Sequence, residues 1–186
     1  MKPGGDVIAE LAADHRELED LFSQIELQPV DHPRRRELAD RLTAELVRHT
    51  VAEEWHLYPA VRKHVPHGAA LADKELADHA GVEQMLRDLE ELSVEDPRFN
   101  DTIAKLKFEV ASHVREEEHE LFPKLAATLP PEELEELGQL VRRARETAPT
   151  RPHLSLPNTP PASRLLVPSA GLVDRVRDLL RTTSSG

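Results

Sequence analysis

The chain carries two similar stretches, HTVAEEWHLYP at residues 49–59 and HVREEEHELFP at residues 113–123. Each contains a histidine, a glutamate four residues later and a proline near its end. Residues four apart lie on the same side of an α-helix, so the histidine and the glutamate can point at one place. Proline removes a backbone donor and clashes with the preceding turn, so we expect Pro59 and Pro123 to kink or end their helices.

The two stretches belong to a longer internal repeat. Shifting the chain by 64 residues, the offset between His49 and His113, also aligns Asp14 and His15 with Asp78 and His79, and Tyr58 with Phe122. Leucines could match by chance between layers of a helical bundle, but histidine, glutamate and proline matching at one offset is hard to explain by packing. The repeated feature is therefore polar.

Four predicted helices each carry a histidine followed by a glutamate four residues later. The pairs are His15 and Glu19, His49 and Glu53, His79 and Glu83, and His113 and Glu117. In the second and fourth helices the histidine continues the apolar stripe, because His49 follows Leu46 and His113 follows Val110 at helical spacing. Burying such groups without partners would cost several kcal/mol per charge, by order of magnitude, against a net stability of roughly 5 to 15 kcal/mol.

A bound cation would offset that cost. Imidazole and carboxylate ligands suit a first-row transition metal, and helical bundles build two-metal sites from carboxylates on facing helices. There are more candidate ligands than one ion can take, so we expect two ions bridged by carboxylates. An isolated His-x-x-x-Glu is usually a solvated surface pair. Four of them in register favour metal ligation by His15, His49, His79, His113, Glu53, Glu117 and Glu83, and leave Glu19, Glu54 and Glu118 open.

Composition narrows the chemistry. The 186 residues include no cysteine, which excludes a disulfide framework, an iron–sulfur cluster and a thiol nucleophile. Lys and Arg number 24 against 35 Asp and Glu, a formal net charge of −11, which argues against nucleic acid as a partner. Neither a long apolar run nor the pattern of a signal peptide is present, so we expect no membrane partner and a cytoplasmic protein.

The chain is expected to be all-α. It is poor in aromatic residues (3%), and apolar residues recur at three- and four-residue steps over about 6–27, 32–59, 68–92 and 97–129. These segments predict an up-down-up-down four-helix bundle over residues 1–129, followed by an additional surface helix at 130–147. A proline-rich linker is expected at 148–168 and a short amphipathic C-terminal helix at 169–186, docking on the bundle or on a protein partner.

The histidine pattern resembles the hemerythrin-like, HHE cation-binding domains. The resemblance rests on His15, the stretch 49–59, His79 and the stretch 113–123, and covers about residues 6–129. It implies a non-haem centre of two iron ions inside the bundle, bridged by an oxo or hydroxo group and by carboxylates. Glu53 and Glu117 would be the bridging carboxylates. His15 and His49 would bind one iron, and His79 and His113 the other.

Two positions depart from the oxygen-carrying hemerythrins. Glu83 stands where those proteins have a second histidine in the third helix, and Glu117 follows His113 by four residues rather than five. An added carboxylate favours ferric iron and makes the centre more similar to carboxylate-rich di-iron oxidases, so simple oxygen carriage is not expected. Tyr58, near one end of the site, could tune or quench its chemistry, but the favoured interpretation is a packing residue like Phe122.

Three functions compete at this stage. The first is a di-iron protein that binds or reacts with dioxygen, peroxide or nitric oxide, with peroxide disproportionation or an oxidative-stress role as examples. The second is a non-catalytic iron- or oxygen-binding sensor module that acts through a partner. The third is a purely structural bundle whose polar pairs face solvent.

Overall fold

The structure is a computed structural model that describes residues 5–151 and is all-α over that range. Its α-helices are α1 (Val7–Leu27), α2 (Arg34–Ala52), α3 (Tyr58–His64), α4 (Gly68–Glu91), α5 (Pro97–Glu116), α6 (Phe122–Ala126) and α7 (Pro131–Thr147). Two π-helical turns, η1 (Glu53–Leu57) and η2 (Glu117–Leu121), join α2 to α3 and α5 to α6. The expected linker beyond residue 151 and the expected C-terminal helix lie outside the described residues.

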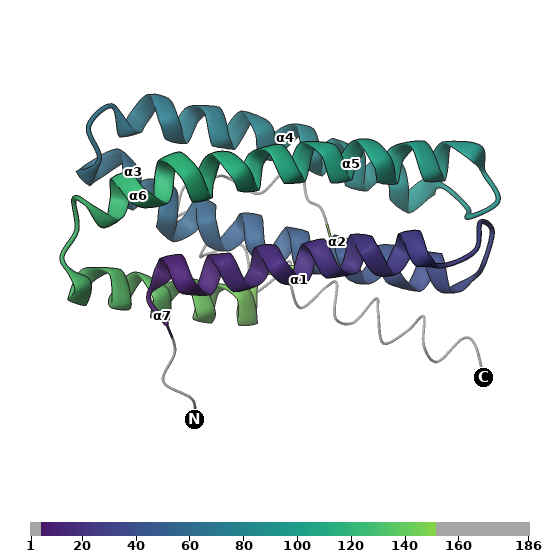
Figure 1. The fold of residues 1–186 in the computed structure, drawn as a ribbon, viewed down its shortest axis with the longest axis horizontal. Coiled ribbons are helices and arrows are strands. Elements are labelled where there is room, and N and C mark those ends of the chain that lie inside the picture. Colours follow the sequence, from purple (N-terminus) through teal and green to yellow (C-terminus); the bar gives the residue numbers. More distant parts are fainter. Residues whose placement is uncertain (1–4, 152–186) are drawn as a thin grey trace.

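Four long rods form the expected up-down-up-down bundle, as Figure 1 shows. They are α1, the continuous α2–η1–α3, α4, and the continuous α5–η2–α6. Within residues 5–151, none of these helices combines the length and the apolar character that crossing a membrane requires.

A π-helical turn precedes each of the two prolines, and the rod continues beyond it. In these turns Tyr58 N–H donates to the Glu53 carbonyl and Phe122 N–H donates to the Glu117 carbonyl. A helix cannot place a normal α-helical bond at a residue that lacks an N–H, and widening the preceding turn accommodates Pro59 and Pro123. Both π-turns begin at a glutamate of the repeated polar feature, a position typical of functional sites.

The apolar core is divided into two clusters along the bundle. One cluster includes Leu11, Trp55 and Phe122, and the other includes Leu18, Leu46 and Val110. On α1, His15 separates Leu11 from Leu18, so the polar residues occupy a layer between the two clusters. Packing on both sides holds this layer in place.

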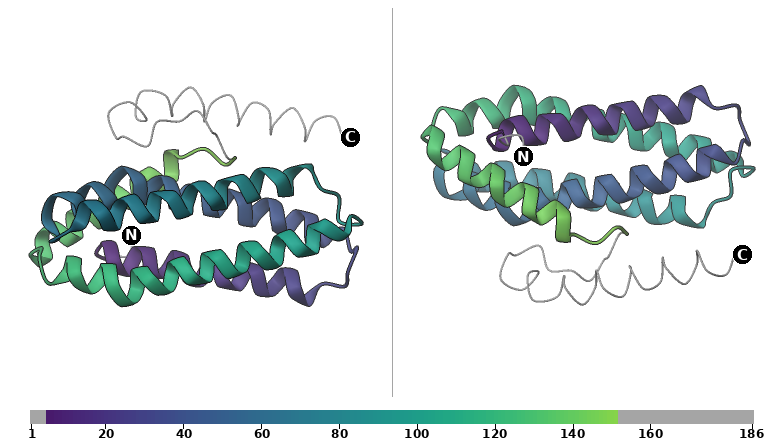
Figure 2. Two further views of the ribbon diagram at one scale, coloured as in Figure 1. Left: turned by 90° about the horizontal axis from the view of Figure 1, so that it is seen from above. Right: turned by 90° about the horizontal axis from the view of Figure 1, so that it is seen from below.

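Helix α7 lies against α1 and α2 outside the four-rod bundle, at the end where α1 begins (Figure 2). Leu134, Val141 and Ala144 are buried in that contact. Gly138 permits the close approach, because a Cβ at this position would lie 2.6 Å from the Gly5 carbonyl oxygen and 2.9 Å from the Val7 nitrogen. The expected additional helix is therefore firmly packed on the bundle.

Candidate metal centre

Six buried side chains point at one place in the middle of the bundle. They are His15 of α1, His49 of α2, His79 of α4, His113 of α5, Glu53 at the start of η1 and Glu117 at the start of η2. His49 Nε2 lies 3.1 Å from Glu53 Oε1, and His79 Nε2 lies 3.3 Å from Glu53 Oε2. His15 Nε2 lies 3.4 Å from Glu117 Oε2. Each imidazole therefore directs its Nε2 atom inward, toward the carboxylates.

The side chains of the four histidines are between 0 and 9% exposed, and those of the two glutamates are fully buried. The interpretation as a structural bundle with solvated polar pairs is therefore wrong. Imidazoles and carboxylates removed from water need compensation, either from one another or from a cation.

The donor atoms fit a bound metal. His15 Nε2, His49 Nε2, Glu53 Oε1 and Glu117 Oε2 are buried, and none of them makes a hydrogen bond with residues 5–151. One ligand atom from each of these four residues lies within 4.8 Å of the other three. Glu53 also groups with His79 and His113 on the other side, so this carboxylate is shared by two sets of histidines. Nitrogen and oxygen donors of this kind suit first-row transition metals.

Every inward-pointing histidine has a carboxylate at its outer nitrogen. Glu118 Oε1 lies 2.9 Å from His15 Nδ1, and Glu54 Oε1 lies 3.0 Å from His79 Nδ1. Glu75 Oε2 lies 2.8 Å from His113 Nδ1. At His15 and His79 this contact is a hydrogen bond, which favours the tautomer in which Nδ1 carries the proton and Nε2 can bind a metal.

The fourth histidine, His49, has the longest of these contacts. Its outer carboxylate is Asp14, whose Oδ2 lies 3.5 Å from His49 Nδ1, an ion-pair contact rather than a hydrogen bond. Asp14 is buried, and Arg145 of α7 donates to its other oxygen, Oδ1.

The residue after each π-turn differs between the two halves of the centre. The Tyr58 hydroxyl lies 3.0 Å from His79 Nε2 and donates to Glu117 Oε1 at 3.1 Å. Phe122, its counterpart in the repeat, stacks on the His15 ring at 5.8 Å between centroids with an interplanar angle of 3°. The hydroxyl of Tyr58 thus reaches the centre, which favours the alternative of a tuning role over the packing role expected for it.

Opposed effects set the proton affinities of this layer. Burial lowers the pKa of His79, but its hydrogen bonds to Glu53 and Glu54 raise it more, to about 9 overall. Burial likewise lowers the pKa of His113, and Glu117, Glu53 and Glu75 outweigh that effect, so the net pKa is well above its usual value. Burial and the charges of Glu117 and Glu53 raise the pKa of Tyr58 well above its usual value.

The two central carboxylates shift in opposite directions. Burial raises the pKa of Glu53, but the neighbouring histidines lower it further, and the net pKa is well below the usual value. Burial and the charge of Glu53 raise the pKa of Glu117. The layer thus favours the protonated forms of His79 and His113, which is the response of a site suited to positive charge.

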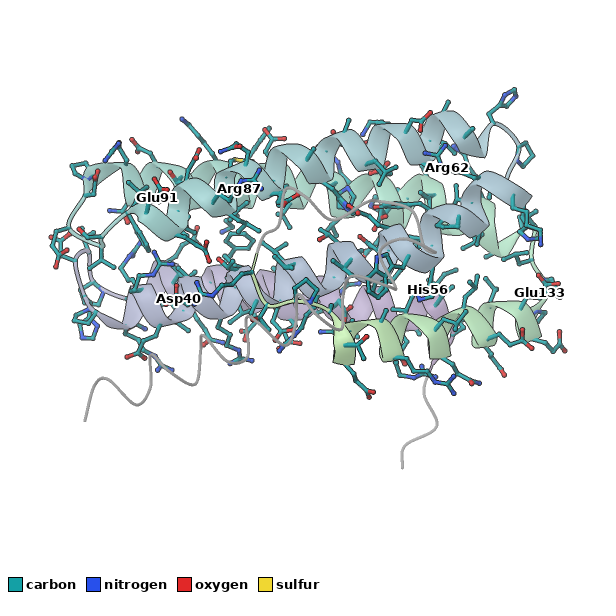
Figure 3. All side chains as sticks on the ribbon, turned by 180° about the vertical axis from the view of Figure 1, so that it is seen from behind. Asp40, His56, Arg62, Arg87, Glu91 and Glu133 are labelled. Carbon is teal, nitrogen blue, oxygen red and sulfur yellow. The ribbon has the colours of Figure 1, made fainter. Side chains whose placement is uncertain are left out.

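The structure does not bring Glu83 or Glu19 into the centre. Glu83 accepts a hydrogen bond from Arg87 at 2.9 Å and its side chain is 32% exposed, which corrects the expectation that it points at the metal. Arg87 lies on α4 toward the far end of the bundle, away from His56 and α7 (Figure 3). Glu19 is exposed at the surface of α1.

A cavity of about 360 Å³ lies between α1 and α5 on the His15 side of the centre. His15, Phe22, Val110 and Val114 line it, and Arg16 and Glu118 stand beside them. Arg16 donates to Glu118 at 2.6 Å. The His15 half of the centre therefore has open space next to it.

The similarity of this chain to known proteins agrees with a cation-binding site. The family model described as the Hemerythrin HHE cation binding domain matches residues 6–125, which is more than half of the chain. The chain belongs to this family. The matched segment contains all six residues that converge on the centre. The His and Glu cluster therefore lies inside the segment that matches the cation-binding family.

Two proteins and one solved structure are similar to this chain. An uncharacterized hemerythrin-like protein of Schizosaccharomyces pombe is 28% identical over 168 residues, covering 90% of this chain and 82% of that protein. A DNA nickase of a Nostoc species is 29% identical over 133 residues, which cover 71% of this chain but only 37% of the nickase. The crystal structure of a hemerythrin HHE domain-containing protein from Mycobacterium kansasii, a homolog of Rv2633c, has a TM-score of 0.67 and 27% identity, covering 76% of this chain and 85% of that one.

Proposed function

We propose that this hemerythrin-like protein holds two iron ions and reacts with dioxygen, peroxide or nitric oxide. The observation that supports the proposal is the convergence of four buried imidazole nitrogens and two buried carboxylates, Glu53 and Glu117, on one layer of the bundle. In this arrangement His15 and His49 would hold one ion, His79 and His113 the other, and the two glutamates would lie between them. Bound iron would supply Lewis-acid and redox chemistry toward these small molecules.

The protein's contribution is to present its ligands already oriented. Glu118 and Glu54 make hydrogen bonds to the outer nitrogens of His15 and His79, and Glu75 and Asp14 lie 2.8 and 3.5 Å from those of His113 and His49. Ligand groups fixed in this way bind a metal more tightly than flexible ones, because less conformational freedom is lost on binding.

The two halves offer different surroundings to a small ligand. The Tyr58 hydroxyl occupies the His79 half and donates to Glu117. The His15 half has an apolar ring, Phe122, and the neighbouring cavity between α1 and α5. A dioxygen or peroxide molecule would therefore approach from the His15 side.

Metal analysis and spectroscopy of the purified protein test the proposal. We expect about two iron ions per chain and a visible absorption spectrum that changes on addition of hydrogen peroxide. An iron content well below that with an unchanged fold would overturn the di-iron assignment.

Turnover separates reaction from binding. Peroxide consumption by the native protein should exceed that of His49→Ala and Glu53→Ala variants. If the native protein holds its full iron content but consumes peroxide no faster than these variants, the result would support the alternative, a non-catalytic sensor module that acts through a partner. A cytoplasmic location stays a prediction from the sequence.

A further inference from the structure

Arg145 connects α7 to the His49 side of the centre. Its Nη1 donates to Asp14 Oδ1, and Asp14 Oδ2 lies 3.5 Å from His49 Nδ1. Its Nη2 donates to Glu45 Oε2 of α2 at 3.1 Å, and Glu17 lies 3.8 Å away. One guanidinium group thus contacts carboxylates of both helices that carry the His15–His49 half.

The internal repeat shows what happens to the same aspartate without such a helix. Asp14 corresponds to Asp78, which likewise precedes the histidine of its helix. Asp14 is buried with a side chain 4% exposed, whereas the Asp78 side chain is 42% exposed and pairs with Lys74. At His113 the outer carboxylate is not Asp78 but Glu75, one turn earlier on α4.

Burial of Asp14 is costly unless a cation accompanies it, because a carboxylate removed from water loses its hydration. Helix α7 covers α1 and α2, and Arg145 is the cation that it brings to Asp14. Within residues 5–151 no corresponding arginine contact is seen at Asp78. The inward position of Asp14 is therefore tied to the presence of α7.

We propose that Arg145 is a positioning residue of the metal centre, which acts through Asp14 to orient His49. Helix α7 is then a functional part of the centre rather than a covering helix. This inference rests on the proposed function, because it assumes that His49 binds a metal ion.

A neighbouring arginine on the same helix provides the control. Arg142 donates to the Gly5 carbonyl at 2.9 Å and to Glu10 at 2.6 Å, and its side chain is about as exposed as that of Arg145. Arg142 therefore helps α7 to dock on α1 without contacting a histidine partner. A docking role alone would make the Arg142→Gln and Arg145→Gln variants behave alike.

The experiment compares Arg145→Gln, Arg145→Lys, Arg142→Gln, Asp14→Asn and the double variant Asp14→Asn with Arg145→Gln, each loaded with ferrous iron in air. Three quantities are measured: iron retained against a chelator, the visible spectrum, and the reduction potential. We expect Arg145→Gln to weaken iron retention about tenfold, the lower end of the effect of removing a direct partner of a metal-binding histidine, because the arginine acts through Asp14. Its potential should shift to more negative values, because the Asp14 charge is no longer compensated. Arg145→Lys should restore part of both properties.

Two further results complete the pattern. Arg142→Gln should retain iron and keep its spectrum even where its melting temperature falls. Arg145→Gln should add little to the effect of Asp14→Asn, because the arginine acts through that carboxylate.

Equal losses in the two arginine variants, or additive effects in the double variant, would overturn the inference while the native protein still binds iron. A native protein that binds no iron would overturn the proposed function and this inference together. If Arg145→Gln does not fold, Arg145→Lys and Asp14→Asn provide the same comparison.

Discussion

The two halves of the centre have the same kind of inner side chains but different surroundings. Each half has two histidines that point Nε2 inward, with ring centroids 5.0 Å apart for His15 and His49 and 4.9 Å apart for His79 and His113. Beyond these, one half has the Phe122 ring and the other the Tyr58 hydroxyl.

The outer carboxylates differ in the same way. On the His15–His49 half, Arg16 and Arg145 bind the outer carboxylates Glu118 and Asp14. On the other half, the ammonium group of Lys74 lies 4.0 Å from Glu75. The internal repeat thus preserves the histidines and glutamates that converge on the centre, while the residues around them differ between the two halves.

The largest effect is expected from the carboxylates that the halves share. Glu53→Gln should lower iron content from about two ions to less than one per chain, because Glu53 faces both histidine pairs and an amide is a weak ligand for iron. Glu117→Gln should act similarly. Elemental analysis after loading and desalting measures the change.

Glu83→Gln is the matched control. It makes the same chemical change on α4 at a residue that pairs with Arg87, and should leave iron content unchanged. Loss of iron in this variant would mean that Glu83 moves inward when metal binds, and would restore the expectation drawn from the sequence.

The inner ligands could be predicted because they repeat. His15, His49, His79 and His113 stand at one offset on helical positions that packing would give to leucine, and Glu53 and Glu117 follow by four residues. Helical periodicity can be read from the local sequence. It therefore predicts the bundle and the burial of these six side chains inside it, as the structure has them.

The surroundings could not be predicted, for three physical reasons. The contacts of Tyr58 depend on the π-turn, which turns this residue toward the face of Glu53, whereas in an α-helix a residue five positions after Glu53 would lie well to the side. Glu75 corresponds to Leu11 in the repeat, so no internal match marks it. Asp14 is turned inward by Arg145, more than a hundred residues away in the chain.

A smaller effect is expected from pH on the metal-free protein. The pKa of His79 is about 9 in the folded chain against 6.5 for an ordinary histidine, so its stabilising contribution is complete below pH 6.5 and is lost as pH rises through 9. Thermal melting of the metal-free protein should therefore occur at progressively lower temperature across this range.

Replacing the titrating group checks that assignment. A His79→Gln variant should show a flatter dependence of melting temperature on pH over the same range. A native melting temperature that rises between pH 6.5 and 9 would contradict the sign of the His79 contribution.

Exchanging the residues after the π-turns tests the difference between the halves. Tyr58→Phe gives both halves a phenyl ring and should cost about 1 kcal/mol of unfolding free energy in the metal-free protein, because the hydrogen bond to Glu117 is lost. Iron content should stay near the native value while the visible spectrum changes. Phe122→Tyr is the reciprocal variant, and it should perturb the spectrum through the His15 half. Identical spectra for the native protein and Tyr58→Phe would mean that the hydroxyl does not influence the bound metal.

The smallest effect is expected at the surface of the His15 half, where Arg16 binds Glu118. The Arg16 side chain is 59% exposed and that of Arg145 only 26%, although both arginines contact the outer carboxylate of a histidine. Water and salt screen an exposed pair, so Arg16→Gln should lower the unfolding free energy by less than about 1 kcal/mol, and the difference should shrink further at high salt. Denaturant unfolding at low and high ionic strength measures it.

Arg16→Gln should also retain iron better than Arg145→Gln, because Glu118 keeps its 2.9 Å contact with His15 and remains accessible to water. If the two variants lose iron equally, the lower exposure of Arg145 has no effect on iron retention. Arg16 of α1 would then support the centre as much as Arg145 of α7 does.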